Sequence, residues 1–226
     1  MPFVILFSRS KEKRIARRNS YSQFGEDMLI ASFLLSKGIT DPDYMDIGAY
    51  DPYKFSNTAY LYEQGSRGIN IEANAERAAK IEKARPGDIT LNIGVGPENG
   101  ELDFFIMNAS VLNTFSREQA ERLEREFGKK IRKVVKVPVM RIRDIVDRYA
   151  GGVFPVILTI DAEGMDLEIL RDIDYDDNYP RIICAETREY AEKLEGTKDE
   201  ELIGYLKSKG YAIVGETGLN TIFYKE

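Results

Sequence analysis

The sequence predicts an α/β protein with a mostly parallel seven-stranded sheet, helices on both faces and a C-terminal antiparallel hairpin. Two observations predict this fold class. Short, almost continuously apolar runs alternate with segments of helical pattern, as is typical of interior strands in a parallel sheet. The last two runs are separated by residues 215–218, whose two glycines suit a hairpin turn.

Each strand is expected where aliphatic and β-branched residues gather between glycine, proline or polar breaks. The seven expected strands are residues 44–48, 68–72, 89–95, 156–161, 181–186, 211–214 and 221–224. Two further extended segments, 102–107 and 134–140, lie between the third and fourth of these strands. We expect them to form an insertion on the same domain, because no linker separates them from it.

Helices are indicated by polar residues at expected N-termini and by glycines at expected ends. The polar residues are Ser22, Ser56, Ser116 and Thr197. The last two are followed three residues later by Gln119 and Glu200, the pattern of a capping box. The first two helices are expected to end at Gly38 and Gly65.

The chain is expected to form a single domain over residues 21–226, with the insertion at about 100–140 and a basic extension at residues 1–20. The extension holds six basic residues and one acidic residue, whereas the whole chain has a net charge of −6. We expect this segment either to contact an anionic membrane or a partner, or to be a frayed terminus. The sequence has no apolar window of the ~20 residues that a membrane helix needs, so a cytoplasmic location is expected.

The composition excludes several kinds of chemistry. The 226-residue chain contains no histidine, and its one cysteine, Cys184, cannot form an internal disulfide. Serine–histidine and cysteine–histidine nucleophile pairs, histidine zinc sites and imidazole acid–base catalysis are therefore excluded. Proton transfer must fall to carboxylates, lysine, tyrosine or water. The acidic body of the chain lacks the basic face that phosphates require, so nucleic acid is not expected as a partner.

Acid and amide side chains recur where the expected parallel strands end, which is where open α/β sheets bind ligands. They are Asp46, Glu72, Asn92, Asp161, Glu163 and Glu186. The separation in the sequence between the glycine turn at Gly48 and Glu72 suits an acid that accepts both hydroxyls of a ribose. The turn lacks the further glycines that cradle a pyrophosphate. A nucleoside without phosphates fits better, which indicates S-adenosylmethionine as the cofactor.

Seven segments in this order resemble the FkbM-type methyltransferase family, and together they span most of the chain. They are residues 22–27, 46–49, 56–58, 68–74, 137–139, 160–164 and 180–186. The resemblance implies a Rossmann-like class I methyltransferase fold. It also implies O-methylation, with S-adenosylmethionine as donor and a sugar, nucleotide-sugar or glycosylated natural product as acceptor.

The resemblance further implies which residues bind the cofactor, with Glu72 at the ribose and Asn92 at the adenine. The residues expected at the cofactor are Gln23, Asp46, Gly48, Ala49, Ser56, Asn57, Glu72, Ala73, Asn92, Ile93 and Asp161. Gln23, Glu26 and Asp27 are expected on an N-terminal helix that folds over the site. Two positions depart from the family pattern, because Asp51 stands where histidine is common and Asn113-Thr114 replaces a more usual Ser-Thr.

Asp161 and Glu163 are the leading candidates for the base that deprotonates the acceptor hydroxyl, and Glu186 completes a carboxylate cluster. Such a cluster is also an alternative site for Mg²⁺ or Ca²⁺. Aromatic residues between Tyr50 and Tyr62 are candidates either for a sugar-binding mouth or for simple packing. Two other functions stay open: an NAD-dependent sugar-modifying enzyme, which the missing glycines disfavour, and a non-catalytic cofactor-binding module of a glycan assembly complex.

Overall fold

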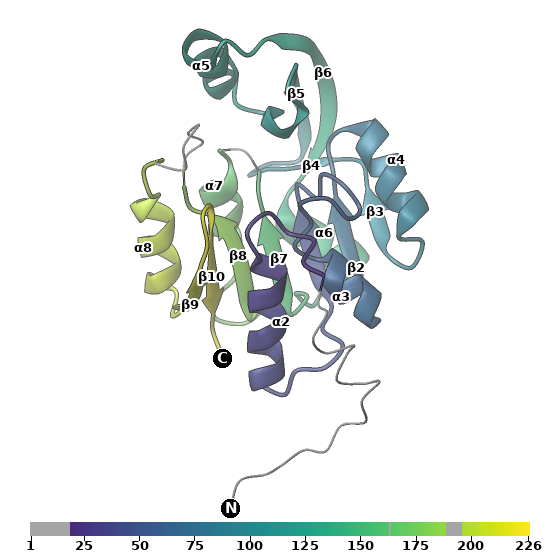
Figure 1. The fold of residues 1–226 in the computed structure, drawn as a ribbon, viewed down its shortest axis with the longest axis vertical. Helices are drawn as coiled ribbons and strands as arrows, with labels where there is room; N and C mark the ends of the chain where they lie inside the picture. The colour runs from purple at the N-terminus through teal and green to yellow at the C-terminus, as the bar shows by residue number, and fades with distance from the viewer. Residues whose placement is uncertain (1–18, 163, 189–195) are drawn as a thin grey trace, which may run out of the picture.

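The computed structural model describes residues 19–162, 164–188 and 196–226, so the basic extension expected at residues 1–20 lies almost wholly outside the described residues (Figure 1). A seven-stranded sheet forms the centre of the molecule. In spatial order its strands are β3 (Ile89–Leu91), β2 (Gly68–Ile71), β1 (Tyr44–Ile47), β7 (Ile157–Ile160), β8 (Ile182–Glu186), β10 (Asn220–Tyr224) and β9 (Ala212–Glu216). The first five strands run parallel, and β10 is antiparallel to both of its neighbours. This confirms the predicted fold class.

The strand order reverses between β1 and β7. From β1 the chain adds β2 and then β3 on one side, whereas β7 and β8 extend the sheet on the other side. Both β1 and β7 are buried along their whole length, with Asp46 in register with Thr159. A crevice forms beyond the carboxyl ends of the strands at such a reversal, and ligands of open α/β sheets bind there.

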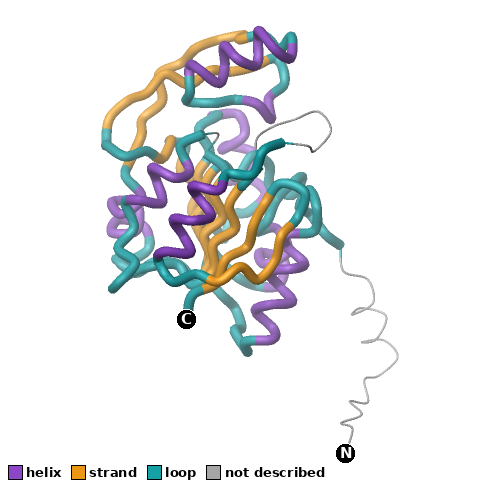
Figure 2. The backbone as a smooth tube through the Cα atoms, turned by 90° about the vertical axis from the view of Figure 1, so that its left-hand side faces the viewer, coloured by secondary structure: helices purple, strands orange, loops and turns teal. Residues whose placement is uncertain are grey.

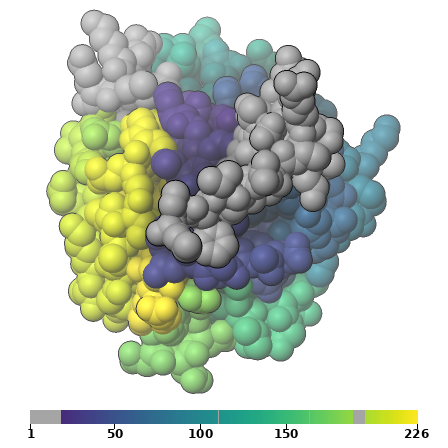
Figure 3. Space-filling model, turned by 60° about the horizontal axis from the view of Figure 1, so that its bottom comes forward, coloured from purple at the N-terminus to yellow at the C-terminus, as the bar shows by residue number. Residues whose placement is uncertain are grey.

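Helices cover both faces of the sheet. One face carries α2 (Glu26–Ser36) and α3 (Ala59–Gln64), and the other carries α6 (Ile142–Tyr149), α7 (Asp166–Arg171) and α8 (Glu200–Ser208) (Figure 1). Helix α4 (Ala75–Ala84) packs beside β3 at the sheet edge. Figure 3 shows α2 beside the yellow C-terminal hairpin. In the described residues, no helix is both long and apolar enough to cross a bilayer.

The predicted helix starts are correct in part. The Ser56 hydroxyl accepts the Ala59 N–H (3.1 Å) before α3, which ends at Gly65 as expected. Helix α8 is instead capped by Asp199, whose carboxylate accepts the Leu202 N–H (2.9 Å), so the expected cap at Thr197 is wrong. A carboxylate suits this position because it also interacts favourably with the helix dipole.

A second, three-stranded sheet lies above the carboxyl ends of the main sheet (Figures 1 and 2). Its order is β4 (Gly94–Val95), β6 (Ile131–Met140) and β5 (Gly100–Met107). The 3-10 helix η1 (Ser110–Leu112) and helix α5 (Arg117–Phe127) connect β5 to β6, with the Ser116 hydroxyl capping α5. Buried side chains from these elements form a small core of their own. We call residues 94–140 the inserted layer.

The run at 89–95, expected as one strand, is two strands in different sheets. The Asn92 amide donates to the carbonyls of Glu72 (2.9 Å) and Ala73 (3.0 Å), which ends the pairing of β3 with β2 at Leu91. The next residues pair instead with the end of β6 in the inserted layer. A side-chain amide that bonds a neighbouring backbone competes with the ladder of a sheet, and here it redirects the chain.

A buried arginine connects the loop after β1 to the rest of the fold. Arg85, which directly follows α4, is 1% exposed. Its guanidinium donates to the Pro52 carbonyl (2.5 and 2.9 Å) and to the hydroxyls of Ser56 (2.7 Å) and Thr58 (2.8 Å). The Thr58 hydroxyl donates in turn to the carboxylate of Asp46 (2.6 Å). The loop and the end of β1 are thus held by one side chain.

The same guanidinium faces a buried acid on the other side. Arg85 donates to the side-chain amide oxygen Oδ1 of Asn70 (3.2 Å) and lies 3.9 Å from the Asp88 carboxylate. Asp88 also accepts from the Tyr44 hydroxyl (2.5 Å), the Gly68 N–H (2.9 Å) and the Asn70 amide (2.9 Å). A buried ion pair is tolerated when its remaining donors and acceptors are satisfied in this way.

Arg85→Ala is expected to lower the free energy of unfolding by about 3–5 kcal/mol, because it leaves a buried carboxylate and several buried acceptors without their donor. Urea denaturation followed by circular dichroism measures the change. Lys80→Ala, at an exposed position of α4, is the matched control. Its free energy of unfolding should stay within about 0.5 kcal/mol of that of the unsubstituted protein. Equal stability of the two variants would contradict the assignment.

Candidate active site

A cavity of about 600 Å³ lies between the carboxyl ends of the central strands and the inserted layer. Its size falls within the range of small-molecule and cofactor sites. The predicted site residues that line it are Gln23, Asp46, Gly48, Ala49, Ser56, Asn57, Glu72, Ala73, Ile93, Asp161 and Glu186. Strand ends that are far apart in the sequence are thus brought together at one cavity, as expected for parallel strands that end at the same edge of a sheet.

Two other residues that the sequence analysis singled out, Asn92 and Asp51, are absent from this lining. Asn92 is engaged by the backbone of the neighbouring strand and is absent from the cavity wall. Asp51 accepts the N–H groups of Tyr53 (3.1 Å) and Lys54 (2.9 Å), so it shapes its own turn. Glu163 lies outside the described residues.

Gly48 allows the closest approach of two strand ends in the site. It has a positive φ of 79°, and a Cβ at this position would lie 2.1 Å from the Asp161 carbonyl oxygen. The Gly48 and Ala49 N–H groups both donate to the Ile71 carbonyl, at 3.0 and 3.1 Å. The turn after β1 is therefore held against β2 and β7, with its backbone at the floor of the cavity.

Asp46 is more deeply engaged than its sequence position suggests. One carboxylate oxygen accepts from the Thr159 hydroxyl (2.5 Å) and the other from the Thr58 hydroxyl (2.6 Å). Burial raises the pKa of Asp46. Asp46 is 5% exposed and lines the cavity, and its two hydroxyl contacts fix β1 against β7 and against the loop before α3.

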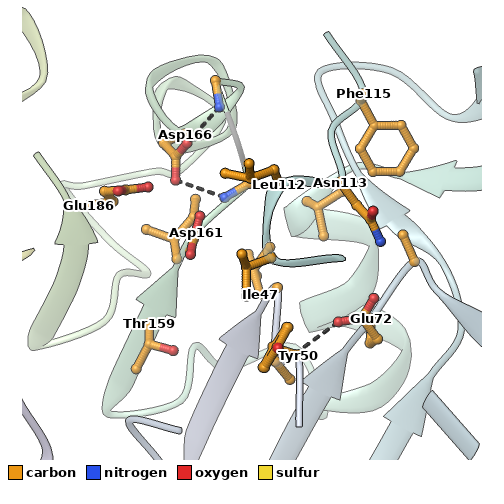
Figure 4. Close-up of a pocket in the computed structure, with 18 of the residues that line it drawn as sticks. Ile47, Tyr50, Glu72, Leu112, Asn113, Phe115, Thr159, Asp161, Asp166 and Glu186 are labelled. Atoms are coloured by element: carbon orange, nitrogen blue, oxygen red, sulfur yellow. Dashed lines mark hydrogen bonds between the residues drawn. The ribbon is translucent and has the colours of Figure 1, made fainter. Parts of the chain in front are cut away.

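Glu72 presents its carboxylate to the cavity at the end of β2. One oxygen accepts the Asn74 N–H (2.7 Å), and the other accepts the Tyr50 N–H (2.9 Å), the bond dashed in Figure 4. Both oxygens are therefore held by backbone groups. Burial raises the pKa of Glu72. Each carboxylate oxygen retains a further acceptor position. A ligand with two neighbouring hydroxyls can use them.

Tyr50 brings two further side chains to this part of the wall. It has a positive φ of 59°, its ring stacks on Phe55 with centroids 6.1 Å apart, and the Arg77 guanidinium lies 3.7 Å from its centroid. A positive φ is uncommon for a bulky residue and is often found at functional sites. Arg77 is a residue that the sequence reasoning missed.

The N-terminal segment reaches the site differently from the prediction. Helix α2 begins only at Glu26, so Gln23 lines the cavity from the segment before the helix. The Glu26 carboxylate accepts from the Thr217 hydroxyl (2.5 Å) and the Asn220 amide (3.1 Å). Asp27 accepts from Ser20, Tyr21 and Ser22. These two acids hold the segment in place and are absent from the cavity lining.

Three carboxylates lie on the side of the cavity away from Glu72 (Figure 4). Asp161 directly follows β7, and Glu186 ends β8. Asp166, which the sequence reasoning missed, accepts the N–H groups of Ala162 (3.0 Å) and Gly164 (3.4 Å). Burial raises the pKa of Asp166. Its contacts hold the loop that follows Asp161, and Asp161 and Glu186 line the cavity from the ends of β7 and β8.

The inserted layer forms the roof of the cavity. Its contribution includes Leu112, Asn113, Phe115 and Arg122, from η1, α5 and the residues between them. In the sequence, Asn113 stands out only as a departure from the family pattern. No local pattern places these residues at the cavity, because their position depends on contacts between segments far apart in the chain. The site therefore has a floor from the main sheet and a roof from the insertion.

The described residues contain no group of three acidic or cysteine side chains arranged to hold a metal ion. Of the three carboxylates predicted as alternative ligands, Glu163 lies outside the described ranges. The lone cysteine, Cys184, is buried in β8, and burial raises the pKa of its thiol well above the ordinary value. It packs in the core, as its sequence context predicts.

The sheet order, the reversal between β1 and β7 and the antiparallel β10 define the Rossmann-like class I methyltransferase fold. The Methyltransferase FkbM domain family matches residues 46–213, most of the chain. The protein belongs to this family and is a methyltransferase by family. This confirms the predicted resemblance.

Solved structures with similar folds include a TehB-like SAM-dependent methyltransferase from Corynebacterium glutamicum. The two share 11% sequence identity at a TM-score of 0.44, with 96% of this chain and 95% of that chain covered. A precorrin-6y C5,15-methyltransferase from Geobacter metallireducens shares 12% identity at a TM-score of 0.43, covering 86% and 87%. A T. thermophilus 16S rRNA N2 G1207 methyltransferase shares 10% sequence identity at a TM-score of 0.43. The match covers 88% of this chain and 42% of that chain. No curated protein matches the chain.

Gly48→Ala is expected to destabilise the protein by about 1–3 kcal/mol more than Gly38→Ala does, because only the first substitution forces a Cβ against another strand. Both glycines have a positive φ, but a Cβ at Gly38 meets nothing within 4 Å. Gly38→Ala therefore measures the backbone strain alone. Chemical denaturation of both variants gives the comparison, and equal losses would show that the close approach at Gly48 is unimportant.

Proposed function

We propose that this methyltransferase transfers the methyl group of S-adenosylmethionine to a hydroxyl of a sugar, nucleotide-sugar or glycosylated acceptor. The observation that carries the proposal is the Glu72 carboxylate, held by two backbone N–H groups at the edge of the cavity beside the Gly48 turn. An acid in this position at the second strand of an α/β sheet is suited to the hydroxyls of a ribose. A cytoplasmic location and a small-molecule or glycan acceptor belong to the same proposal.

The residues around the cavity fit a nucleoside cofactor without phosphates. The Gly48 turn carries one glycine and its backbone packs against Asp161, so it offers no cradle for a pyrophosphate. Arg77, a cation close to this turn, lies on the face of Tyr50. Glu72 would hold the ribose, and Asp161 and Gln23 would line the amino-acid end. When bound, S-adenosylmethionine supplies an activated methyl group whose leaving group is a neutral thioether.

Methyl transfer to a hydroxyl needs alignment and a proton acceptor. Alignment of two bound reactants can contribute about 7–11 kcal/mol, and a placed base about 10²–10⁴-fold in rate. Asp161 lies at the end of β7, on the far side of the cavity from Glu72, with Glu186 beside it (Figure 4). In a chain without histidine, carboxylates at this place are the best-positioned bases for a hydroxyl proton.

The wall beside Glu72 supports a sugar as acceptor. Tyr50 and Phe55 line the cavity as a stacked pair, and the Phe55 side chain, which has the Lys54 ammonium 4.8 Å from its ring centroid, is 42% exposed, so part of this aromatic surface is open to solvent. The C–H face of a sugar ring packs on such a surface while its hydroxyls reach polar groups. The carboxylates and the amide of Asn220 supply those groups in the same cavity.

Glu72→Gln is expected to weaken binding of the product S-adenosylhomocysteine by about 10- to 100-fold, because it removes charge-assisted hydrogen bonds to the ribose. Isothermal titration calorimetry on the purified protein measures the affinity. NAD serves as the comparison ligand and is expected not to bind. Binding of NAD without S-adenosylhomocysteine would contradict the proposed function, and unchanged affinity in Glu72→Gln would contradict the ribose assignment.

The same titration should depend on pH through Glu72. Burial raises the pKa of this carboxyl above its ordinary value of 4.5, so it takes up a proton earlier than a free glutamate as the pH falls. Affinity for S-adenosylhomocysteine is therefore expected to be full at neutral pH and to decrease on acidification. The Glu72→Gln variant should lack this dependence, and an identical pH profile in both proteins would contradict the assignment.

Asp161→Asn is expected to lower the rate of methyl transfer by about 10²–10⁴-fold and to weaken cofactor binding by a smaller factor. Transfer of labelled methyl from S-adenosylmethionine to a panel of sugars and nucleotide-sugars measures the rate. Glu186→Gln separates the two candidate bases, and Asp51→Asn, outside the lining, is the matched control. Full activity of Asp161→Asn would remove this residue as the base.

A further inference from the structure

One side of helix α2 is apolar although it is turned away from the rest of the fold. The helix buries the residues that face the sheet, and its outward side is formed by residues about 180° around the helix axis. These outward residues are Met28, Leu29, Ser32, Leu35 and Ser36. Leu29 is 41% exposed and Leu35 is 70% exposed. None of the outward residues is charged, whereas the solvent side of a surface helix is ordinarily polar or charged.

The apolar surface continues beyond the helix at its N-terminal end. Phe24, in the preceding turn, is 39% exposed, and its ring would lie 3.3 Å from a Cβ at Gly218 in the C-terminal hairpin. The Leu29 side chain lies 3.5 Å from the Cβ position of Gly215 in the same hairpin. Figure 3 shows α2 and this hairpin side by side. We call the surface formed by Phe24, Met28, Leu29 and Leu35 the α2 face.

Basic residues flank the α2 face at both ends. At the C-terminal end, Lys37 is exposed and its ammonium lies 4.6 Å from the centroid of the Tyr224 ring. At the N-terminal end, the Ser20 hydroxyl and the Tyr21 N–H each donate to Asp27 in the first turn of α2 (both 2.7 Å). The sequence just before these residues has a net charge of +5, six basic residues less the one acid Glu12. The six are Arg9, Lys11, Lys13, Arg14, Arg17 and Arg18.

We propose that the α2 face docks on an anionic lipid bilayer, with its apolar side chains among the headgroups and the flanking basic residues on the lipid charges. This inference is independent of the proposed function. A bilayer of this kind offers an apolar interior and a negative surface together, and stable attachment ordinarily needs both contributions. The sequence at residues 2–7, which is uncharged and apolar, adds a second apolar part to the basic segment.

Two acids on the elements beside the α2 face already have partners. Glu63 on α3 accepts from the Tyr21 hydroxyl (2.7 Å), and Glu216 on β9 pairs with Lys198 (2.6 Å). The whole chain has a net charge of −6, so an anionic bilayer repels most of its surface. Attachment therefore depends on the α2 face and the basic segment, and it should be sensitive to salt because salt screens exposed charges.

The test is flotation of the full chain with two kinds of vesicle. One kind is phosphatidylcholine alone, and the other also contains about 30% phosphatidylserine, an anionic lipid. The protein is expected to float only with the phosphatidylserine vesicles, and raising NaCl from about 0.05 M to about 0.5 M should release it. Failure to float with the phosphatidylserine vesicles, or equal recovery with both kinds, overturns the proposal.

Two double variants separate the contributions of the face and of the basic segment. Leu29→Gln/Leu35→Gln is expected to lower the partition coefficient about 10- to 100-fold, because it removes apolar surface from the bilayer and leaves the buried side of α2 unchanged. Arg17→Glu/Arg18→Glu should lower it at least about 10-fold by reversing charges near the lipid. Val153→Gln is the matched control, since Val153 is 68% exposed and follows α6 on another part of the surface.

The leucine variant decides the role of the α2 face. Loss of flotation in this variant, with flotation kept in Val153→Gln and an unchanged circular dichroism spectrum in both, supports the proposal. Flotation equal to that of the unsubstituted protein overturns it, even where the basic segment alone attaches to the vesicles. Sedimentation velocity adds a further check. A dimer that becomes a monomer in the leucine variant, with no flotation of the unsubstituted protein, would show that the face contacts a second copy of the chain instead.

Discussion

The buried guanidinium of Arg85 is the interaction on which the site most depends. It donates to the Pro52 carbonyl, to the hydroxyls of Ser56 and Thr58, and to Asn70 in β2. The Thr58 hydroxyl donates in turn to Asp46. The loop that follows the Gly48 turn is thereby held by buried hydrogen bonds. Buried polar groups of this kind are stable only when the whole network is satisfied, and they specify one arrangement of the loop.

The parts of the molecule that local pattern determines were predictable. The central strands are apolar on both sides, so their runs stand out in the sequence, and the carboxyl ends of parallel strands necessarily share one edge. These two facts are enough to place Gly48, Glu72, Asp161 and Glu186 at the same edge of the sheet. The end of the run at 89–95 was not predictable, because nothing local shows that Asn92 bonds a neighbouring strand.

The unpredicted residues depend on contacts between distant segments. In the sequence, Arg85 resembles the exposed cations of an ordinary helix, and only the fold shows that acceptors from two other elements surround it. Asp166 looks like an acid in the first turn of a helix, yet its carboxylate serves the preceding loop. Asn113 could be noticed only as a departure from a family pattern. Its burial within the roof follows from how the inserted layer packs.

The inserted layer enters and leaves the main domain at adjacent points. Strand β4 leads into it and the end of β6 leads out, and the two are paired in parallel, with Gly94 opposite Val139 and Val95 opposite Met140. The residues between these pairs are therefore attached to the main domain at one place, and their buried side chains pack largely among themselves. The layer therefore begins and ends on one pair of neighbouring strands, so a change in its length alters the roof of the cavity without moving the strand ends that form its floor.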